Sequence, residues 1–449
     1  MTTPEPVLVR RLRLVDAVAV VLSACIGIGI FFSPAEVVAR TGSGGWAMIA
    51  WAAGGLVAIV GGLCFAELGV LRPRMGGQYR MLREAWGPAV GTAYAGTGGL
   101  VIGPGAIAVL AGCGTDFLAQ ALGVQPSPAA WTVCSIGILL ALGLVNWIGI
   151  RRAADLMDVL TLAKVVTIGA LAWAGLWMAL HDAPRHDTSP FALGASPTPT
   201  GFLHAMLPVL FATGGWQQVL WMGGDIREPA RNIPRALFLG IASVLLAYLA
   251  VNASCLWLLG PQAAAASKTI ASDAMSVWWT GAGRWLAAAI GLSAIGTTHV
   301  ILMTTSREQA AFGQTGDGPR WIAPVDPVSG AARRSVGAMT LWACALLVIA
   351  GRDGISSLLD AVVMADFTFL GLCALSVLVL RRRHPDEPRP FRCPLGPVLP
   401  LTFGGVSACI AVTPWLLPEQ RPWALAVTCI VGGLLALGWV RSRRAGSAA

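Results

Sequence analysis

Two apolar segments of this chain are interrupted by glycine, at Gly27-Ile28-Gly29 and at Gly214-Gly215. A helix broken inside a bilayer leaves backbone N–H and C=O groups without helical partners, and hydrocarbon supplies none. A bound polar solute or ion can take their place, so paired breaks are typical of a transporter binding site. The alternative is that the glycines only allow close helix packing. Two breaks, five predicted spans apart, favour the binding site.

A few ionisable side chains fall within or near apolar segments, where charge is costly and usually functional. Lys164 stands out because it lies about ten residues into its segment, which is about 15 Å at 1.5 Å per residue. Asp116, His299 and Asp366 are placed similarly. The sequence assigns no role to these three residues.

The residues do not assemble into a recognisable catalytic set. There is no Ser/His/Asp set, no metal-ligand cluster and no nucleotide-binding loop, since the glycine motifs lie inside apolar segments and not between a strand and a helix. The ten cysteines show no Cys-x-x-Cys spacing. We therefore expect a protein that is not an enzyme and needs neither a cofactor nor a metal ion.

The composition indicates an all-α membrane protein. Of the 449 residues, 56% are hydrophobic and only 12% are charged. A helix needs about 20 apolar residues to cross a bilayer, and the sequence predicts twelve transmembrane helices. Their approximate ranges are 16–39, 46–71, 89–119, 128–149, 157–180, 201–223, 236–260, 284–306, 336–351, 354–380, 396–417 and 423–440.

The basic residues predict how the chain is oriented. Lys and Arg concentrate in cytoplasmic loops, and 24 of the 31 fall on one side of the twelve predicted spans, with 6 on the other and Lys164 inside a span. Both termini are then cytoplasmic, in a multi-pass protein of the plasma (inner) membrane. This asymmetry accounts for the net charge of +9, which suits an anionic lipid surface and requires no nucleic acid partner.

The positions of the breaks suggest an internal repeat within a single transmembrane domain, 1–449. If Gly27 matches Gly214, spans 1–5 (14–180) and spans 6–10 (201–383) form two halves of five, and spans 11–12 (395–442) lie outside them. An odd number of spans inverts the second half relative to the first. This is the five-plus-five inverted repeat with broken helices 1 and 6. Two six-span halves are the rival arrangement.

With these motifs in place, the chain resembles the amino acid–polyamine–organocation superfamily, and within it bacterial permeases similar to L-type amino acid transporters. The resemblance covers nearly the whole chain and implies the leucine-transporter-like fold. The fragments that carry it are Gly27-Ile-Gly-Ile-Phe31, Ser33-Pro34, Ala66-Glu67-Leu68, Pro73, Gly76-Gly77, Tyr79, Asn146, Gly149, Phe211, Gly214-Gly215-Trp216, Glu228-Pro229, Arg231-Asn232-Ile233-Pro234-Arg235, Arg389-Pro390-Phe391 and Pro394.

The resemblance implies a secondary active transporter that moves amino acids by alternating access. The substrate's carboxylate would meet backbone N–H groups of the first break, its ammonium would meet carbonyls of both breaks, and an aromatic gate would cover it. The matching residues are Ala24, Cys25, Gly27, Ile28, Gly29, Phe211, Ala212, Gly214 and the gate Trp216. Many relatives have Ser or Thr where this chain has Ile28, which keeps an amine or polyamine as an alternative substrate.

The resemblance also bears on ion coupling and on partners. A lysine at the position of Lys164 would replace sodium and support exchange or proton coupling. A channel and an amino acid receptor without transport activity are further alternatives. L-type transporters join a heavy subunit through a cysteine in the second outside loop, and 120–128 contain none, so no covalent heavy subunit is expected.

Overall fold

The computed structural model describes residues 12–27, 29–71, 77–148, 189–222, 226–279, 281–326 and 331–446, together with 166, 168–178, 180–181 and 329. These residues are helical or irregular, and the only extended pairing among them is an isolated bridge between Leu12 and Ile226. The helices are α1 (Leu14–Cys25), α2 (Gly29–Thr41), α3 (Gly44–Leu71), α4 (Gly77–Trp86), α5 (Pro88–Thr97), η1 (Gly98–Ile102), α6 (Gly103–Leu122), α7 (Pro128–Ile148), α9 (Pro199–Thr213), η2 (Trp216–Met222), α10 (Pro229–Ala266), α11 (Ile270–Trp278), α12 (Ala282–Gln314), η3 (Arg320–Ile322), α13 (Arg333–Ala350), α14 (Ile355–Arg383), α15 (Val398–Leu416) and α16 (Arg421–Gly446).

Nine helices of the described ranges are long and apolar enough to cross a membrane. The bent pair α1 and α2, which turns by 51°, makes ten if it counts as one span. The sixth predicted span is divided between α9 and η2. The fifth, 157–180, is described mainly over the shorter apolar helix Ile168–Met178. The chain is therefore a multi-pass helical membrane protein, and the number twelve stays a prediction.

Both predicted breaks interrupt helices. The first lies between α1 and α2, where Ile26 still donates to the Leu22 carbonyl at 2.8 Å. In the second, α9 ends at Thr213, and Gly215 has a φ of 101° before η2 begins. A side chain on Gly215 would also meet the Ala24 carbonyl oxygen at 2.5 Å from its Cβ. Only glycine tolerates both the backbone conformation and this close approach.

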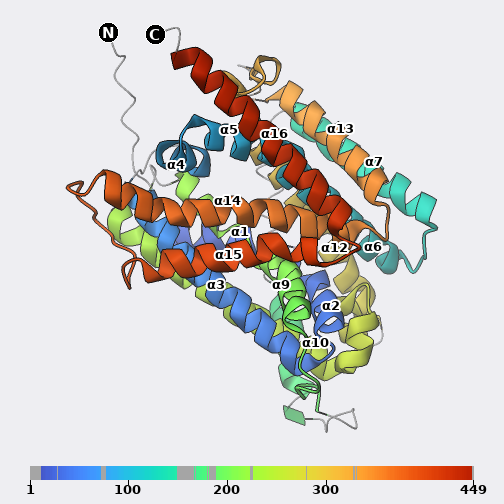
Figure 1. Cartoon of the computed structure of the whole chain (residues 1–449). Coiled ribbons are helices and arrows are strands. Elements are labelled where there is room, and N and C mark those ends of the chain that lie inside the picture. The colour runs from blue at the N-terminus through green and yellow to red at the C-terminus, as the bar shows by residue number, and fades with distance from the viewer. Residues whose placement is uncertain are drawn as a thin grey trace.

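The helices that carry the breaks pack together and are enclosed by longer helices. In Figure 1, α2 and α9 lie side by side near α10, while α14 and α15 run alongside each other above α3. The helix α10 packs along both α1 and α3, and α6 packs along α12. The breaks are thus held in the interior of the bundle.

The third predicted span is one run of helix with a π-helical stretch inside it. The Gly103 N–H group bonds to the Gly98 carbonyl, five residues back, where an α-helix would use four. This irregular turn, at 98–102, comes immediately before Pro104, whose ring removes a backbone donor.

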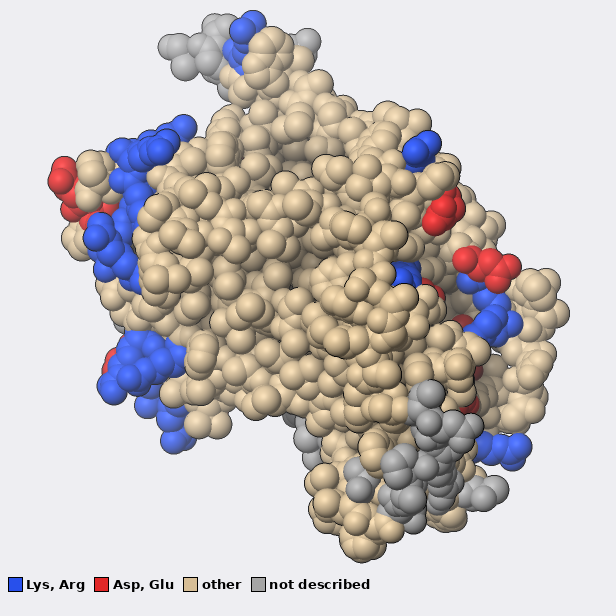
Figure 2. Space-filling view, turned by 60° about the horizontal axis from the view of Figure 1, so that its bottom comes forward, with Lys and Arg blue, Asp and Glu red and all other residues tan. Residues whose placement is uncertain are grey.

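Charged side chains lie at two ends of the molecule and leave an uncharged belt between them, as Figure 2 shows. One end carries mostly Lys and Arg, and the other carries both signs. At the end of α14, buried Glu67 forms ion pairs with Arg381 (2.5 Å) and Arg389 (3.2 Å) and accepts the backbone N–H of Cys393 at 2.7 Å. We call this end, where α14 terminates in Arg381, Arg382 and Arg383, the arginine-rich face.

Candidate substrate-binding site

A cavity of about 180 Å³ lies where the two breaks meet. Its wall comes from α1, α2, α9 and the second break on one side and from α4, α5, η1, α6, α12 and α14 on the other. Pockets for drug-sized ligands measure about 300–1,000 Å³, so this cavity suits a smaller solute. Seven of the predicted site residues line it together: Ala24, Cys25, Gly27, Gly29, Phe211, Ala212 and Gly214.

The other predicted site residues are placed differently. Trp216 is not among the residues that line the cavity, and only 3% of its surface is exposed. Its indole packs edge-on against Phe65, with ring centroids 5.0 Å apart, and against Phe403 at 6.4 Å. Ile28 and Lys164 lie outside the described residues.

Tyr248, on α10, holds the two breaks together. Its hydroxyl donates towards the Cys25 carbonyl at 2.8 Å and the Ala212 carbonyl at 3.2 Å, while its ring packs edge-on against Trp51. A buried tyrosine hydroxyl needs such partners. Tyr248 was not among the predicted site residues, although it is one of only three tyrosines and lies within an apolar span. Two carbonyls predicted to bind the substrate's ammonium therefore already have a donor beside them. The Cys25 carbonyl also accepts the Gly27 N–H group at 2.8 Å.

The start of α2, at Gly29, has no room for a side chain. A Cβ atom at this position would lie 2.8 Å from the Ala212 Cα atom, which is backbone of the second break. At Gly27, in contrast, the nearest atom to such a Cβ is Thr297 Cγ2 at 3.7 Å, an ordinary contact. The two glycines of one motif thus have different steric requirements.

Polar side chains form the opposite wall of the cavity. The Tyr94 hydroxyl donates to Gln78 Oε1 at 2.5 Å, and Glu308 and Asp366 border the same space. Glu308 was not among the predicted site residues, because the predicted eighth span ends at 306. The structure extends α12 to Gln314, because the helix continues beyond its apolar stretch.

A second, larger cavity of about 540 Å³ adjoins the first on the arginine-rich face. It shares Thr304 and Glu308 with the central cavity and includes Tyr79, which lies on α4, outside the spans. Burial and a hydrogen bond to Asp317 raise the pKa of Tyr79, so its hydroxyl remains a neutral donor. The central cavity therefore faces the arginine-rich side.

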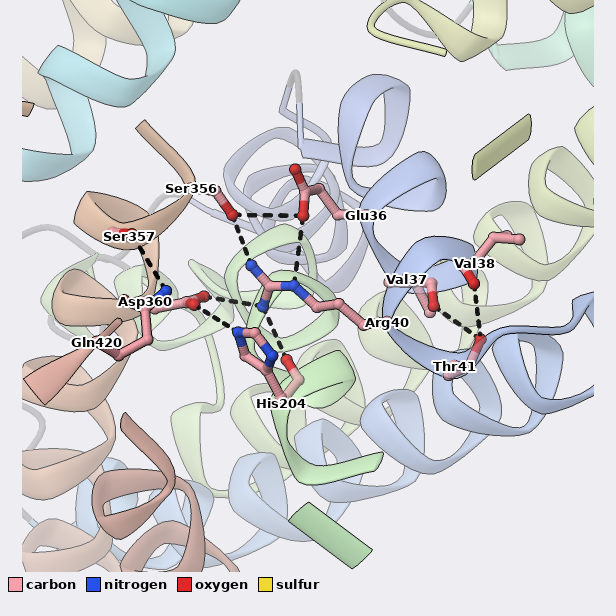
Figure 3. A network of polar contacts seen from close by, with 10 residues as sticks. All are labelled: Glu36, Val37, Val38, Arg40, Thr41, His204, Ser356, Ser357, Asp360 and Gln420. Carbon is pink, nitrogen blue, oxygen red and sulfur yellow. Dashed lines mark hydrogen bonds and ion pairs between the residues drawn. The ribbon is translucent and has the colours of Figure 1, made fainter. Parts of the chain in front are cut away.

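On the opposite face, a network of ion pairs joins α2, the helix that follows the first break, to α9 and α14 (Figure 3). Arg40 of α2 reaches Asp360 of α14 at 3.0 Å, and His204 of α9 contacts the other oxygen of that carboxylate at 3.0 Å. Arg40 also donates to Ser356 at 2.6 Å and pairs with Glu36 at 3.3 Å. We call Glu36, Arg40, His204, Ser356 and Asp360 the outer network.

Two residues that the sequence left without a role have specific partners. Asp116 pairs with Arg352 at 2.6 Å near the outer network. His299 lies beside Asn146, with 2.9 Å between its Nδ1 atom and the amide nitrogen, and so links α12 to α7. The first contact ties α6 to the connection between α13 and α14, and the second ties two helices together.

Comparison with known proteins decides the family. A sequence model described as amino acid permease matches residues 12–435 of this chain. The chain belongs to the amino acid permease family. This permease is an amino acid transporter and not an enzyme, and the comparisons do not favour the amine alternative.

Individual relatives support this assignment along most of their length. The b(0,+)-type amino acid transporter 1 of Rattus norvegicus is 26% identical over 429 residues, which cover 95% of the permease and 87% of the relative. The Asc-type amino acid transporter 1 of Mus musculus is 28% identical over 88% of the permease and 75% of the relative. The large neutral amino acids transporter small subunit 2 of Homo sapiens is 28% identical over 94% of the permease and 78% of the relative.

Proposed function

We propose that the permease is a sodium-independent secondary active transporter that moves amino acids by alternating access, through exchange or proton coupling. The observation that carries the proposal is the cavity at the meeting point of two broken helices. The outer network separates this cavity from one face, and a larger cavity adjoins it on the other. Such an arrangement corresponds to an inward-facing state, if the arginine-rich face is cytoplasmic.

The substrate's charged groups have matching partners at the breaks. The first N–H groups of a helix have no helical acceptor and attract an anion, so the start of α2 at Gly29, with Gly27 and Ile28 before it, suits a carboxylate. Carbonyls at the ends of α1 and α9 attract a cation. We assign the substrate's ammonium to the carbonyls of Ala24, Cys25, Phe211 and Ala212.

The same proposal includes the five-plus-five inverted repeat and twelve spans. Broken α1 and α2 would correspond to broken α9 and η2, α3 to α10, and α5 with α6 to α12. Both members of each pair pack in the centre of the bundle. An inverted repeat allows one half to rock against the other around a fixed site. An even number of spans then leaves both termini on the same side of the membrane. The Lys and Arg side chains at one end of Figure 2 support the cytoplasm as that side.

We assign the coupling role to Lys164, whose ammonium would stand where sodium-dependent transporters of this fold hold a cation. Replacement of sodium by choline then leaves uptake unchanged. Strong sodium stimulation of the purified protein would contradict this assignment.

We also propose that the permease works in the plasma membrane without a covalent heavy subunit. One relative carries the words small subunit in its name. In this chain, however, the connection between α6 and α7 contains no cysteine. Non-reducing electrophoresis of the protein from native membranes should therefore show a single band that reducing agent does not shift.

Counterflow in liposomes tests the transport mechanism. Purified protein is reconstituted into liposomes that contain a pool of unlabelled amino acids. Uptake of a panel of labelled amino acids is then measured with and without a pH gradient. Uptake that requires internal substrate identifies an exchanger, and uptake into empty vesicles driven by the pH gradient identifies a proton-coupled importer. A channel would show neither saturation nor counterflow, and a receptor would bind without any uptake.

A further inference from the structure

We propose that the permease has a second amino acid site, in a cavity that we call the outer pocket, where the substrate's carboxylate and ammonium bind before the outer network opens. The outer pocket has a volume of about 250 Å³ and borders the outer network. The inference rests on the proposed function, because it places this site on the substrate's path to the central cavity. It adds a site, and it can fail while amino acid transport itself stands.

The outer pocket lies one helical turn beyond the central cavity along four helices. Each of α2, α6, α9 and α14 contributes residues to both cavities. Three residues of an α-helix rise by about 4.5 Å, so the two cavities are consecutive along one path. The residues of the outer pocket and their counterparts three positions away in the central cavity are Phe32 and Gly29, Cys113 and Leu110, Pro208 and Phe211, and Leu359 and Val362.

Two aromatic rings stand between the outer pocket and the central cavity. Phe32 lines the outer pocket, Phe211 lines the central cavity, and their ring centroids lie 6.2 Å apart. Glu36, Arg40 and Ser356 of the outer network also line the outer pocket. A solute in this pocket therefore contacts the groups that must move before it reaches the central cavity.

The charges of the outer pocket suit a zwitterion. Its described lining residues include three acidic and three basic side chains, whereas the charged side chains that line the described part of the central cavity are acidic. A wall of balanced charge favours neither a free cation nor a free anion. Phe32, Ile355 and Leu359 add apolar surface for the side chain of a neutral amino acid. The six charged residues are Glu36, Arg40, Asp116, Lys268, Arg352 and Asp353.

Two of the basic residues have donors available for the substrate's carboxylate. Lys268 is exposed, in the connection between α10 and α11, and no described residue forms an ion pair with it. Arg352 donates to Asp116 at 2.6 Å and to the Pro126 carbonyl at 3.4 Å, yet its buried Nε atom has no hydrogen-bond partner among the described residues. An unsatisfied buried donor costs free energy. A carboxylate supplies acceptors for both side chains.

Glu36 provides the matching site for the substrate's ammonium. Its Oε2 atom contacts Arg40 at 3.3 Å and Ser356 at 3.3 Å, while its side chain is 41% exposed. Arg40 also has Asp360 as a partner. An ammonium on Glu36 therefore competes with Arg40 for this carboxylate and weakens one ion pair of the outer network. Arrival of the substrate is in this way linked to opening of the network.

Cys113 reports on occupancy of the outer pocket, because it lines the pocket. The experiment labels it with a membrane-impermeant thiol reagent outside liposomes that contain the full-length protein, followed by peptide mapping. The probes are the amino acid with the fastest counterflow and its carboxamide, which lacks the negative charge. We expect the amino acid to slow the labelling at a lower concentration than the carboxamide does.

Lys268→Gln distinguishes the outer pocket from the central cavity, whose described lining residues include no lysine. An exposed charge pair changes affinity by about two- to fivefold, so the advantage of the amino acid over its carboxamide should shrink by this factor. Lys268→Arg keeps the charge and should retain the advantage. Arg284→Gln, at the start of α12, removes an exposed positive charge outside the pocket and is the matched control.

Transport supplies a second measurement, which depends on the side of the membrane. In Lys268→Gln, the KM for uptake into intact cells should rise by about two- to fivefold. The KM measured with inside-out vesicles should keep its wild-type value, because these vesicles present the arginine-rich face to the substrate.

An unchanged advantage of the amino acid over its carboxamide in Lys268→Gln overturns the inference and leaves the proposed function intact. Protection of Cys113 by acetate or chloride alone overturns it as well, because the pocket would then be an anion site. Equal rises of KM on both sides, in a variant with the wild-type melting temperature, also contradict it. Absence of counterflow with every amino acid defeats the proposed function itself.

Discussion

Arg40 and Asp360 form an ion pair of 3.0 Å although they lie 320 positions apart in the chain. The Asp360 carboxylate is fully buried, and the Arg40 side chain is 8% exposed. The pair joins the second half of a broken helix to α14 and so closes the central cavity on the side opposite the arginine-rich face (Figure 3). Opening to that side requires these charges to separate.

Asp360→Asn should favour the conformation that is open to this side. Removal of one partner of a buried pair typically costs about 3–5 kcal/mol, and here the cost falls on the closed state. Cys113 lines the adjacent outer pocket and serves as a native reporter. We expect a membrane-impermeant thiol reagent to label Cys113 faster in the variant, as measured by peptide mapping. Asp353→Asn changes a carboxylate of the same pocket that lies outside the network. In this control variant, Cys113 should be labelled at the wild-type rate. Equal rates in both variants would contradict a gating role.

Gly29→Ala should abolish uptake, whereas Gly27→Ala should retain a substantial part of it. A methyl group at position 29 would lie 2.8 Å from the Ala212 Cα atom of the second break. A methyl group at position 27 would lie 3.7 Å from the Thr297 Cγ2 atom, which is an ordinary contact. Initial rates of exchange, normalised to the amount of folded protein, compare the two variants directly. The steric argument fails if Gly27→Ala is the more damaging change.

Tyr248→Phe should reduce exchange by up to about tenfold while the protein still inserts and folds. A net contribution of about 0.5–1.5 kcal/mol is typical of a hydrogen bond, and this hydroxyl serves the carbonyls of both breaks. The phenyl ring keeps its contact with Trp51. Transport kinetics and the melting temperature are measured together. Wild-type kinetics would mean that the breaks hold their geometry without this hydroxyl.

Trp216→Ala should lower thermal stability as well as uptake. We predicted a gate at this residue, and the structure shows its indole packed between Phe65 and Phe403. Truncation of a buried tryptophan to alanine typically costs about 3–5 kcal/mol. Trp216→Phe retains an aromatic ring and should recover most of both properties. Loss of uptake at unchanged melting temperature would restore the gate as the better explanation.

The all-helical membrane architecture and both breaks followed from the sequence because they depend on local properties. Long apolar stretches identify spans through the cost of exposing polar backbone to lipid, and glycine pairs such as Gly214-Gly215 mark helix breaks through their backbone freedom. The predicted span ends were less accurate at α12, because hydropathy ends where the apolar residues end. The helix itself continues with Arg307 and Glu308.

The site's polar environment was decided only by tertiary structure. The sequence alone determined a helical membrane protein with glycine breaks at Gly27 and Gly214, since composition and local residue type suffice for that. It contained no signal that Tyr248 would bridge the two breaks, that Arg40 would meet Asp360, or that Glu308 and Asp366 would line one cavity. Each of these arrangements involves helices that are distant in the chain, and only the packing of the whole bundle brings such helices together.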